Sequence, residues 1–272
     1  MEGLNDIKGK TILITGGAAG LGAAYGERFL KSGAKALAIL DVDETTGKAT
    51  TDRLNRTYAD KVIFVKCDVS KEEDIDAAFK KVVQQFGYLD VLVNNAGVMS
   101  DAPHMWRMCC DINWQGLVSL TLKAVAHMRK DEGGNGGTIV NISSAAGVEK
   151  VHILPIYCGS KAAVLHFSIT LAENPFFDRT GIRVLTIGFG PTATALMDNV
   201  SNKVYEKNLA KDFEGVEVPS QKVESAVAAF FEMFKEGENG SVWMSVDDKP
   251  VKNITPIIDR FHEEYKKAVY EQ

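Results

Sequence analysis

The sequence predicts an α/β fold with one doubly wound, seven-stranded parallel sheet, helices on both faces and a C-terminal helical extension. Short runs of Ile, Val and Leu alternate with longer amphipathic segments along most of the 272 residues. This alternation is typical of parallel strands joined by crossover helices. The strand segments are apolar throughout, so both faces of the sheet should be covered.

The elements can be placed in order along the chain. The predicted strands are 11–15, 36–40, 62–65, 91–93, 138–142, 182–187 and 241–246. The predicted helices are 20–32, 45–57, 72–86, 115–130, 156–173 and 221–235, followed by an amphipathic C-terminal helix at about 256–270. We find no linker and no internal repeat, so residues 1–272 are expected to form a single domain.

Composition and charge exclude several classes of function. The net charge is −5 and no run of Lys or Arg could follow a phosphate backbone, which argues against nucleic acid as a partner. The four cysteines lack the paired spacing of a zinc site, and the adjacent Cys109 and Cys110 argue against a disulfide framework. The five histidines have no metal-ligand spacing either, so no metal is expected. Without a leader-like N-terminus or an apolar stretch of about 20 residues, we expect a cytoplasmic protein with no membrane span.

A glycine-rich turn follows the first predicted strand. Thr15-Gly-Gly-Ala-Ala-Gly-Leu-Gly22 begins where that strand ends and finishes inside the next helix. Glycines let a backbone approach a pyrophosphate closely, and a helix N-terminus supplies unpaired N–H groups. An ordinary strand-to-helix turn also uses glycine, but the strand and helix on either side favour the dinucleotide-binding turn of a Rossmann-type domain.

An acidic residue indicates which dinucleotide would bind. Asp41 ends the second predicted strand, 19 residues after Gly22. A carboxylate there would accept hydrogen bonds from the adenosine ribose hydroxyls and would repel a 2′-phosphate. No Lys or Arg occurs at 17–19 or next to Asp41 to neutralise such a phosphate, so NAD is predicted rather than NADP. The alternative is that Asp41 starts a solvated turn with Asp43 and Glu44.

Six motifs in this order resemble the short-chain dehydrogenase/reductase family, in its compact branch, from Lys10 to about Met244. They are Thr15-Gly-x-x-x-Gly-x-Gly22, Asp68, Asn94-Asn-Ala-Gly97, Asn113, Ser144 and Tyr157-x-x-x-Lys161. Within the family, residues 133–147 and the short segment between Gly97 and Asn113 are similar to 15-hydroxyprostaglandin dehydrogenase-like and insect alcohol dehydrogenase-like proteins.

The resemblance implies a catalytic set of Asn113, Ser144, Tyr157 and Lys161. Ser143 competes for the serine position, but Ser144 lies 13 residues before Tyr157, as the family pattern asks. The expected cofactor-binding residues are Gly16, Ala19, Gly20, Leu21, Gly22, Asp41, Val42, Asp68, Val69, Asn95, Ala96, Gly97, Tyr157, Lys161, Gly190, Thr192 and Thr194. Of these, Asp68 and Val69 would contact the adenine.

The residue types suit proton transfer. A free tyrosine has a pKa of about 10, so Tyr157 needs help to act as a base near neutral pH. Lys161 lies one helical turn further on, and its ammonium, joined by the positive charge of oxidised nicotinamide, should favour the phenolate. Ser144 would hold the substrate oxygen. The resemblance also assigns Lys161 to the nicotinamide ribose and Asn113 to a water chain. A Tyr/Lys pair alone usually marks a surface helix face, but its place after a dinucleotide turn favours catalysis.

The segment after the sixth predicted strand departs from the family pattern. Phe189 stands where the family has Pro. We expect a substrate-covering loop and helix at about 193–220, with an amphipathic helix whose apolar residues, Leu209 and Phe213 among them, lie over a cavity or complete the core. The expected substrate pocket is Ser144, Glu149, His152, Tyr157, Phe189, Leu196 and Met197.

These expectations amount to an NAD-dependent short-chain alcohol dehydrogenase of the EC 1.1.1 type. It would transfer a hydride between a lipophilic secondary alcohol, or its ketone, and the nicotinamide, with Tyr157 as general base and acid. A carbonyl reductase, a sterol or retinoid dehydrogenase, and a catalytically silent dinucleotide-binding sensor are the alternatives. The apolar face of 256–270 would pack on the domain itself or on a second subunit, and we expect a homodimer or homotetramer.

Overall fold

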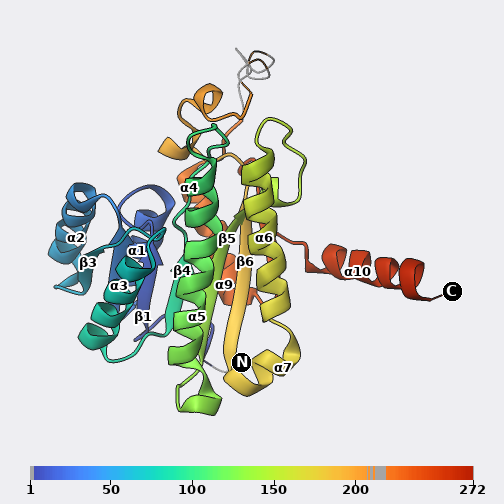
Figure 1. Cartoon of the computed structure of the whole chain (residues 1–272). Helices are drawn as coiled ribbons and strands as arrows, with labels where there is room; N and C mark the ends of the chain where they lie inside the picture. Colours follow the sequence, from blue (N-terminus) through green and yellow to red (C-terminus); the bar gives the residue numbers. More distant parts are fainter. Residues whose placement is uncertain (1–2, 207, 209–210, 212–218, 272) are drawn as a thin grey trace.

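The computed structural model of the chain describes residues 3–206, 208, 211 and 219–271, and contains one eight-stranded sheet (Figure 1). The strand order is β3-β2-β1-β4-β5-β6-β7-β8. The strands are β1 (Thr11–Thr15), β2 (Ala36–Asp41), β3 (Val62–Lys66), β4 (Val91–Asn94), β5 (Gly137–Ser144), β6 (Ile182–Phe189), β7 (Val242–Ser245) and β8 (Lys252–Asn253). The order reverses between β1 and β4, which creates a crevice at the carboxyl ends of these two strands.

The seven predicted strands are confirmed and pair in parallel. The prediction of a seven-stranded, fully parallel sheet is one strand short, because β8 pairs antiparallel with β7 through Trp243 and Met244. Both residues of β8 are exposed. Two exposed residues carry no apolar pattern, so this edge strand leaves no signal in the sequence.

The helices cover both faces of the sheet. They are α1 (Gly20–Lys31), α2 (Glu44–Tyr58), α3 (Glu72–Phe86), α4 (Trp106–Cys110), α5 (Leu117–Met128), α6 (Pro155–Leu171), α7 (Asn174–Thr180), α9 (Val223–Glu236) and α10 (Thr255–Tyr270). One apolar core joins α1 and α9 to the sheet through rings such as Phe29 and Phe230, and a second joins α3 and α5 through residues such as Val82 and Leu120. Helix α6 packs against β5 and β6.

Two helices differ from the predicted bounds. The predicted helix 115–130 begins earlier, at Trp106, and passes through a π-helical turn at Asp111–Gly116 before α5. The predicted helix 156–173 ends at Leu171, and α7 follows it. Pro175 accounts for the break, because proline has no N–H to donate within a helix but fits a first turn.

The covering segment is not the continuous helix that we expected. Between residues 195 and 206 the structure has two 3-10 turns, Ala195–Met197 and Val200–Asn202. Asn199 lies between them in the left-handed conformation, with φ 54°, which interrupts a right-handed helix. The part of the prediction that includes Leu209 and Phe213 lies outside the described residues.

The C-terminal helix α10 extends away from the sheet and its covering helices (Figure 1). It contains no buried residue, and its ring contact to the body joins His262 to His166 of α6. Ile257 is 65% exposed and Phe261 64%, with Tyr265, Val269 and Tyr270 exposed on the same helix. No helix in the described part of the chain has the length and apolar character that a bilayer crossing demands.

A buried arginine anchors the opposite end of the sheet from the crevice. Arg183, near the start of β6, has no exposed surface. Its guanidinium donates to Leu4 O at 2.9 Å, Asn5 Oδ1 at 2.6 Å, Gly237 O at 3.1 Å and Thr138 Oγ1 at 3.3 Å. Because each acceptor is a neutral oxygen, the charge is stabilised by dipoles, and burial lowers the pKa of Arg183 to about 10.

Candidate active site

The glycine turn after β1 has a geometry that favours glycine. Gly16 and Gly20 have φ of 61° and 53°, in the left-handed region. A Cβ on Gly22 would lie 2.2 Å from Gly16 O, which is a collision. No side chain caps the N-terminus of α1, so its first N–H groups face the crevice without a capping acceptor. This exposed, positively polarised helix end, next to which Ala19 and Leu21 lie, is suited to a pyrophosphate.

Asp41 closes the same turn from the end of β2. Its Oδ2 accepts the N–H of Ala18 and its Oδ1 accepts the N–H of Asp43, both at 3.0 Å. The carboxylate is therefore fixed at the rim of the crevice, with further lone pairs available to a sugar hydroxyl. Val42 beside it is 62% exposed.

Asp68 lies after β3 and is bound locally. Its Oδ1 accepts the N–H and the hydroxyl of Ser70 at 3.0 and 2.7 Å. The Ser70 hydroxyl bond is the main reason why the pKa of Asp68 falls below its ordinary value, and Lys71 lowers it further. Val69 is buried beside it. The strands β2 and β3 pair, so Asp41 and Asp68 lie at the same edge of the sheet.

The end of β4 is tied to the glycine turn. Thr15 Oγ1 accepts the N–H groups of Asn95 and Ala96 at 3.0 and 2.9 Å. The Asn95 side chain donates to Thr15 O and Gly16 O at 2.9 and 3.1 Å. These bonds fix the two sides of the crevice relative to each other, with Gly97 in its wall.

Asn113 lies in the π-helical turn before α5, buried and fully hydrogen-bonded. Its Oδ1 accepts the N–H of Val98 at 2.8 Å, and its Nδ2 donates to Val98 O at 2.8 Å and Ser160 Oγ at 3.1 Å. A Cβ on Gly97 would lie 3.3 Å from Asn113 Oδ1 and 3.4 Å from Lys161 Nζ. The absence of that side chain leaves room between the amide and the ammonium. A π turn often marks a functional site because it redirects one side chain.

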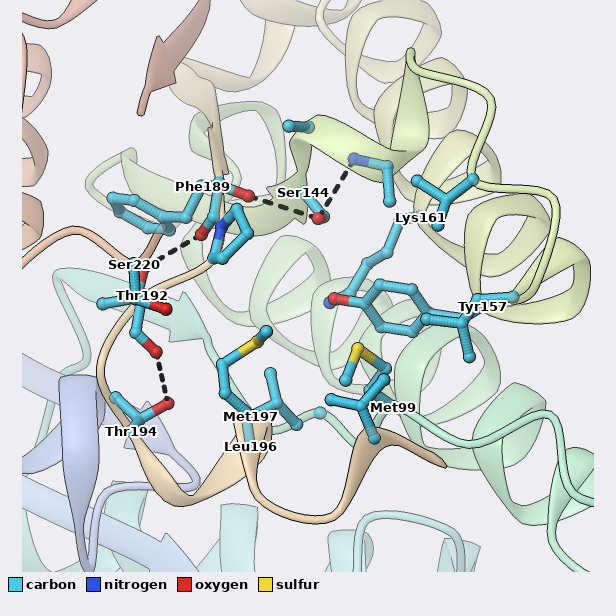
Figure 2. A pocket seen from close by; sticks show the side chains of 18 of the residues that line it. Met99, Ser144, Tyr157, Lys161, Phe189, Thr192, Thr194, Leu196, Met197 and Ser220 are labelled. Carbon is cyan, nitrogen blue, oxygen red and sulfur yellow. Dashed lines mark hydrogen bonds between the residues drawn. The ribbon is translucent and has the colours of Figure 1, made fainter. Parts of the chain in front are cut away.

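Ser144, Tyr157 and Lys161 converge at the carboxyl end of β5 (Figure 2). The Ser144 hydroxyl donates to Phe189 O and accepts the N–H of Ala146, both at 3.2 Å. It also lies near enough to the Tyr157 hydroxyl to lower the pKa of that phenol. In Figure 2 the Tyr157 hydroxyl points toward the Ser144 oxygen and lies beside the Lys161 side chain. The three groups therefore form one cluster.

The side chain of Lys161 is hydrogen-bonded to the backbone of strand β5. Its Nζ donates to Ile142 O at 3.0 Å and lies 6.0 Å from the centre of the Tyr157 ring. Ser143 donates its hydroxyl to the backbone oxygen of Lys161 at 2.9 Å. Of the two adjacent serines, it is thus Ser144 whose hydroxyl meets the tyrosine, as its spacing predicts, while Ser143 fixes the helix backbone.

A cavity of about 760 Å³ opens above this cluster. Its lining includes Leu21, Asn95, Gly97, Gly190, Thr192 and Thr194 on the side of the glycine turn. On the other side the lining is largely apolar and includes Met99, Val151, Ile153, Leu154, Leu196, Met197, Val200 and Val204. Figure 2 shows Met99, Leu196 and Met197 across the cavity from the Ser144 hydroxyl, next to the Tyr157 ring. The cavity is thus polar at the cluster and apolar beyond it.

Most of the residues expected in the substrate pocket line the cavity, but one does not. Ser144, Glu149, Tyr157, Phe189, Leu196 and Met197 line the cavity. His152 is exposed and does not belong to the lining. Met99, Leu154 and Ser220 line it without having been expected. Met99 follows the Asn94–Gly97 motif with no periodic pattern around it, so its orientation leaves no sequence signal.

Phe189, in the place of the family's proline, belongs to both the core and the cavity. It is 6% exposed, and its ring stacks on Tyr25 of α1 with the ring centres 6.5 Å apart. Its carbonyl accepts the Ser144 hydroxyl. The aromatic side chain therefore replaces the rigidity of proline with packing against α1, and Gly190 and Pro191 follow it along the cavity wall.

Comparisons with known proteins agree with this geometry. Residues 10–204 match the family described as short chain dehydrogenase. The chain belongs to the short-chain dehydrogenase/reductase family. It is an oxidoreductase by that membership. The chain is 35% identical in sequence to rat 15-hydroxyprostaglandin dehydrogenase [NAD(+)] over 209 residues, which cover 76% of this chain and 76% of that protein.

Two further proteins extend the similarity beyond residue 204. The chain is 31% identical to alcohol dehydrogenase 1 of Ceratitis cosyra over 243 residues, 88% of this chain and 92% of that protein. The fold is that of a short-chain dehydrogenase/reductase from Mycobacterium marinum, with a TM-score of 0.75, 22% identity, and coverage of 90% of this chain and 96% of that one.

In this short-chain dehydrogenase, burial shifts both ionisable groups of the cluster toward neutrality. Burial raises the pKa of Tyr157 to about 12, although the nearby Ser144 hydroxyl opposes the rise. Burial also lowers the pKa of Lys161 to about 8. The expectation that Lys161 and oxidised nicotinamide together favour the phenolate stays a prediction, because these directions describe the chain without the charge of the cofactor. The ammonium is directed to Ile142 O, and desolvation penalises both charges more than they help each other.

The pKa of Lys161 leads to a testable effect on stability. The unfolded chain binds more protons than the folded one between about pH 8 and the ordinary lysine pKa, so stability rises with pH across that window. Below pH 8 the full cost of the buried charge remains. We expect Lys161→Met to raise the free energy of unfolding by about 2 kcal/mol at pH 7, and by less above pH 9. Urea denaturation at both pH values measures this, with the exposed Lys267→Met as control. Equal or lower stability of Lys161→Met at pH 7 would contradict it.

Proposed function

We propose that this protein is an NAD-dependent alcohol dehydrogenase that transfers a hydride between a lipophilic secondary alcohol, or its ketone, and the nicotinamide. The observation that carries the proposal is that Ser144, Tyr157 and Lys161 line one cavity together, where the polar cluster meets the apolar part of the lining. An alcohol oxygen placed there would meet both a proton acceptor and a hydrogen-bond donor.

Each residue of the cluster has a role in this proposal. In oxidation, Tyr157 takes the proton of the alcohol hydroxyl while the carbinol hydrogen leaves as hydride, and Ser144 holds the oxygen as it becomes a carbonyl. NAD, when bound, supplies the hydride acceptor and a positive charge that offsets the cost of the phenolate. Lys161 holds the nicotinamide ribose and Asn113 anchors the path of the proton to solvent. In reduction the same steps run in reverse.

The residues of the crevice fit a dinucleotide. The uncapped N-terminus of α1 suits the pyrophosphate, and the carboxylate of Asp41 suits the ribose hydroxyls and opposes a 2′-phosphate. Lys66, which is opposite Asp41 on the neighbouring strand, has its ammonium 3.5 Å from Glu44 Oε2 and is therefore already paired with a carboxylate. The name of the rat relative, 15-hydroxyprostaglandin dehydrogenase [NAD(+)], supports the same cofactor.

The apolar part of the cavity supports a lipophilic substrate. Residues from the loop after β4, the segment before α6 and the covering segment meet there, among them Met99, Ile153 and Val204. Glu149 also lines the cavity and would favour a substrate with a hydroxyl away from the reacting carbon. We further propose that residues 1–272 form a single dinucleotide-binding and catalytic domain. The support is that described residues of the covering segment, Leu196, Met197 and Val204 among them, line the cavity beside the cluster. The four cysteines are free, which suits the reducing cytoplasm.

A panel of secondary alcohols tests the proposal. We expect reduced nicotinamide to form with bulky apolar alcohols and NAD, and to form poorly with sugars or with NADP. Tyr157→Phe should abolish turnover, about a thousandfold or more, while NAD still binds, because the phenol ring and its packing remain. Absorbance of the reduced cofactor measures turnover, and fluorescence titration measures binding.

The same assay separates the alternatives. Tyr157→Phe that retains turnover would refute the assigned base. Turnover only with ketones and NADH would favour a carbonyl reductase. A preference of the enzyme for sterols or retinoids over the other alcohols would favour a sterol or retinoid dehydrogenase. NAD binding without turnover of any alcohol or ketone would favour the sensor.

The role of Asp41 gives a second prediction. Asp41→Ser removes the charge that opposes a 2′-phosphate, so the ratio of kcat/KM for NADP to that for NAD should rise by about tenfold or more. Asp52→Ser, which removes an exposed carboxylate on α2, is the matched control and should leave the ratio unchanged. An unchanged ratio in Asp41→Ser would show that this carboxylate does not select the cofactor.

We also propose a homodimer or homotetramer in which α10 packs on a second copy of the chain. The support is its exposed apolar face, which includes Phe261 and Tyr265. Replacing both with Glu should reduce the mass measured by light scattering, because a buried charge without a partner is costly. Lys266→Glu, a charge change on the same helix, is the control. A mass unchanged by the double replacement would contradict this use of α10.

A further inference from the structure

Asp101 is a buried carboxylate outside the catalytic set. It lies in the loop between β4 and α4 and is 1% exposed. It belongs to none of the sequence motifs of the crevice and does not line the cavity. An aspartate is seldom fully buried without a partner of opposite charge or several hydrogen bonds. Its contacts therefore show what the burial achieves.

The first contact of Asp101 is with the start of α6. Leu154, which precedes this helix, offers no side-chain cap, and Pro155 at its first position has no N–H. Ile156 and Tyr157 therefore supply the first unpaired donors of the helix. Asp101 Oδ2 accepts the N–H of Ile156 at 2.5 Å and Oδ1 accepts that of Tyr157 at 2.8 Å. A carboxylate more than 50 residues away in the chain thus acts as the N-cap of the catalytic helix.

The second contact is with the covering segment. The backbone N–H of Asp101 donates to Lys203 O at 2.6 Å. The Lys203 side chain in turn donates to Leu196 O at 2.8 Å, which holds the cavity-lining turn of Leu196. Val204 packs in the same buried cluster as Tyr157. One residue therefore joins the base of the covering segment to the backbone of the tyrosine.

Burial makes the ionised form of Asp101 costly. Burial raises the pKa of its carboxyl above the ordinary value, in spite of the two N–H bonds that lower it. An acid whose pKa is higher in the folded chain than in the unfolded one costs folding free energy once the pH exceeds both values. At neutral pH this cost offsets part of the stabilisation from the two N–H bonds, while their geometric restraint on the start of α6 remains.

We propose that Asp101 is a positioning residue that fixes the position of Tyr157 along the axis of α6, relative to Ser144, and links this position to the covering segment. The inference rests on the proposed function of Tyr157 as base and acid. The two hydrogen bonds act on adjacent backbone N–H groups, so they restrain both the translation and the tilt of the first turn of α6. Loss of one of these bonds would let the phenol oxygen of Tyr157 move relative to the Ser144 hydroxyl. The two hydroxyl groups could then no longer contact the same substrate oxygen.

Asp101→Asn tests the proposal with little change of shape. The amide keeps one acceptor oxygen but turns an N–H₂ group against the other backbone N–H. We expect kcat with the best alcohol of the panel to fall about tenfold to a hundredfold, with KM for NAD changed by less than about twofold. Hydrogen exchange of the Ile156 and Tyr157 amides should become about tenfold faster. The melting temperature should change little, because a buried charge and one capping bond are removed together.

Asp248→Asn is the matched control. Asp248 accepts the N–H of Lys222 at 2.8 Å at the start of α9. Asp248→Asn therefore alters a remote cap, in this case an exposed one, on a helix without catalytic residues. It should leave kcat and the exchange of the α6 amides unchanged. Wild-type protein that turns over no substrate would refute the proposed function, and the exchange measurement would still decide the positioning. Unchanged exchange or unchanged kcat in Asp101→Asn would overturn the inference, as would a loss of kcat that follows a loss of melting temperature.

Discussion

The arrangement on which the rest of the site depends is a phenol and an ammonium buried on consecutive turns of one helix. Tyr157 and Lys161 both lie in the wall of the cavity, where desolvation moves each pKa toward the neutral form. Such a pair is costly in an apolar environment unless other groups hold it. Ile142 O, Ser144 and the backbone bond from Ser143 supply that support from the end of β5. The sheet therefore does more than position the helix: its last residues stabilise the reactive groups directly.

The parts of this site that can be predicted from sequence are those set by local patterns. The glycines of the first turn are required by φ angles and by contacts as short as that between Gly22 and Gly16 O, so the residue type itself is informative. Asp41 follows a strand whose apolar run fixes where the carboxylate lies. Tyr157 and Lys161 share a helix face because of their spacing. The parallel strands were predictable for the same reason, since each is an apolar run buried on both faces.

The parts that could not be predicted depend on contacts between distant segments. The covering segment resembles an amphipathic helix in its pattern, but Asn199 adopts a left-handed conformation and divides it into short turns. His152 has a suitable position in the chain, yet it lies on the surface, while Met99 reaches the cavity from a loop without periodicity. Asp101 looks like an ordinary polar loop residue until the start of α6 is placed against it. The acidity expected of Tyr157 depends on desolvation, which spacing does not report.

The buried guanidinium of Arg183 and the candidate active site lie at opposite ends of the sheet. At the amino ends of the strands, the first residues of the chain, β5 and the turn after α9 meet on this one cation through neutral oxygens. All of the groups discussed for chemistry lie at the carboxyl ends. Sites this far apart with no shared partner behave independently in their energetics. Substitutions in the loops that line the cavity can therefore accumulate without disturbing the buried arginine at the other end of the sheet.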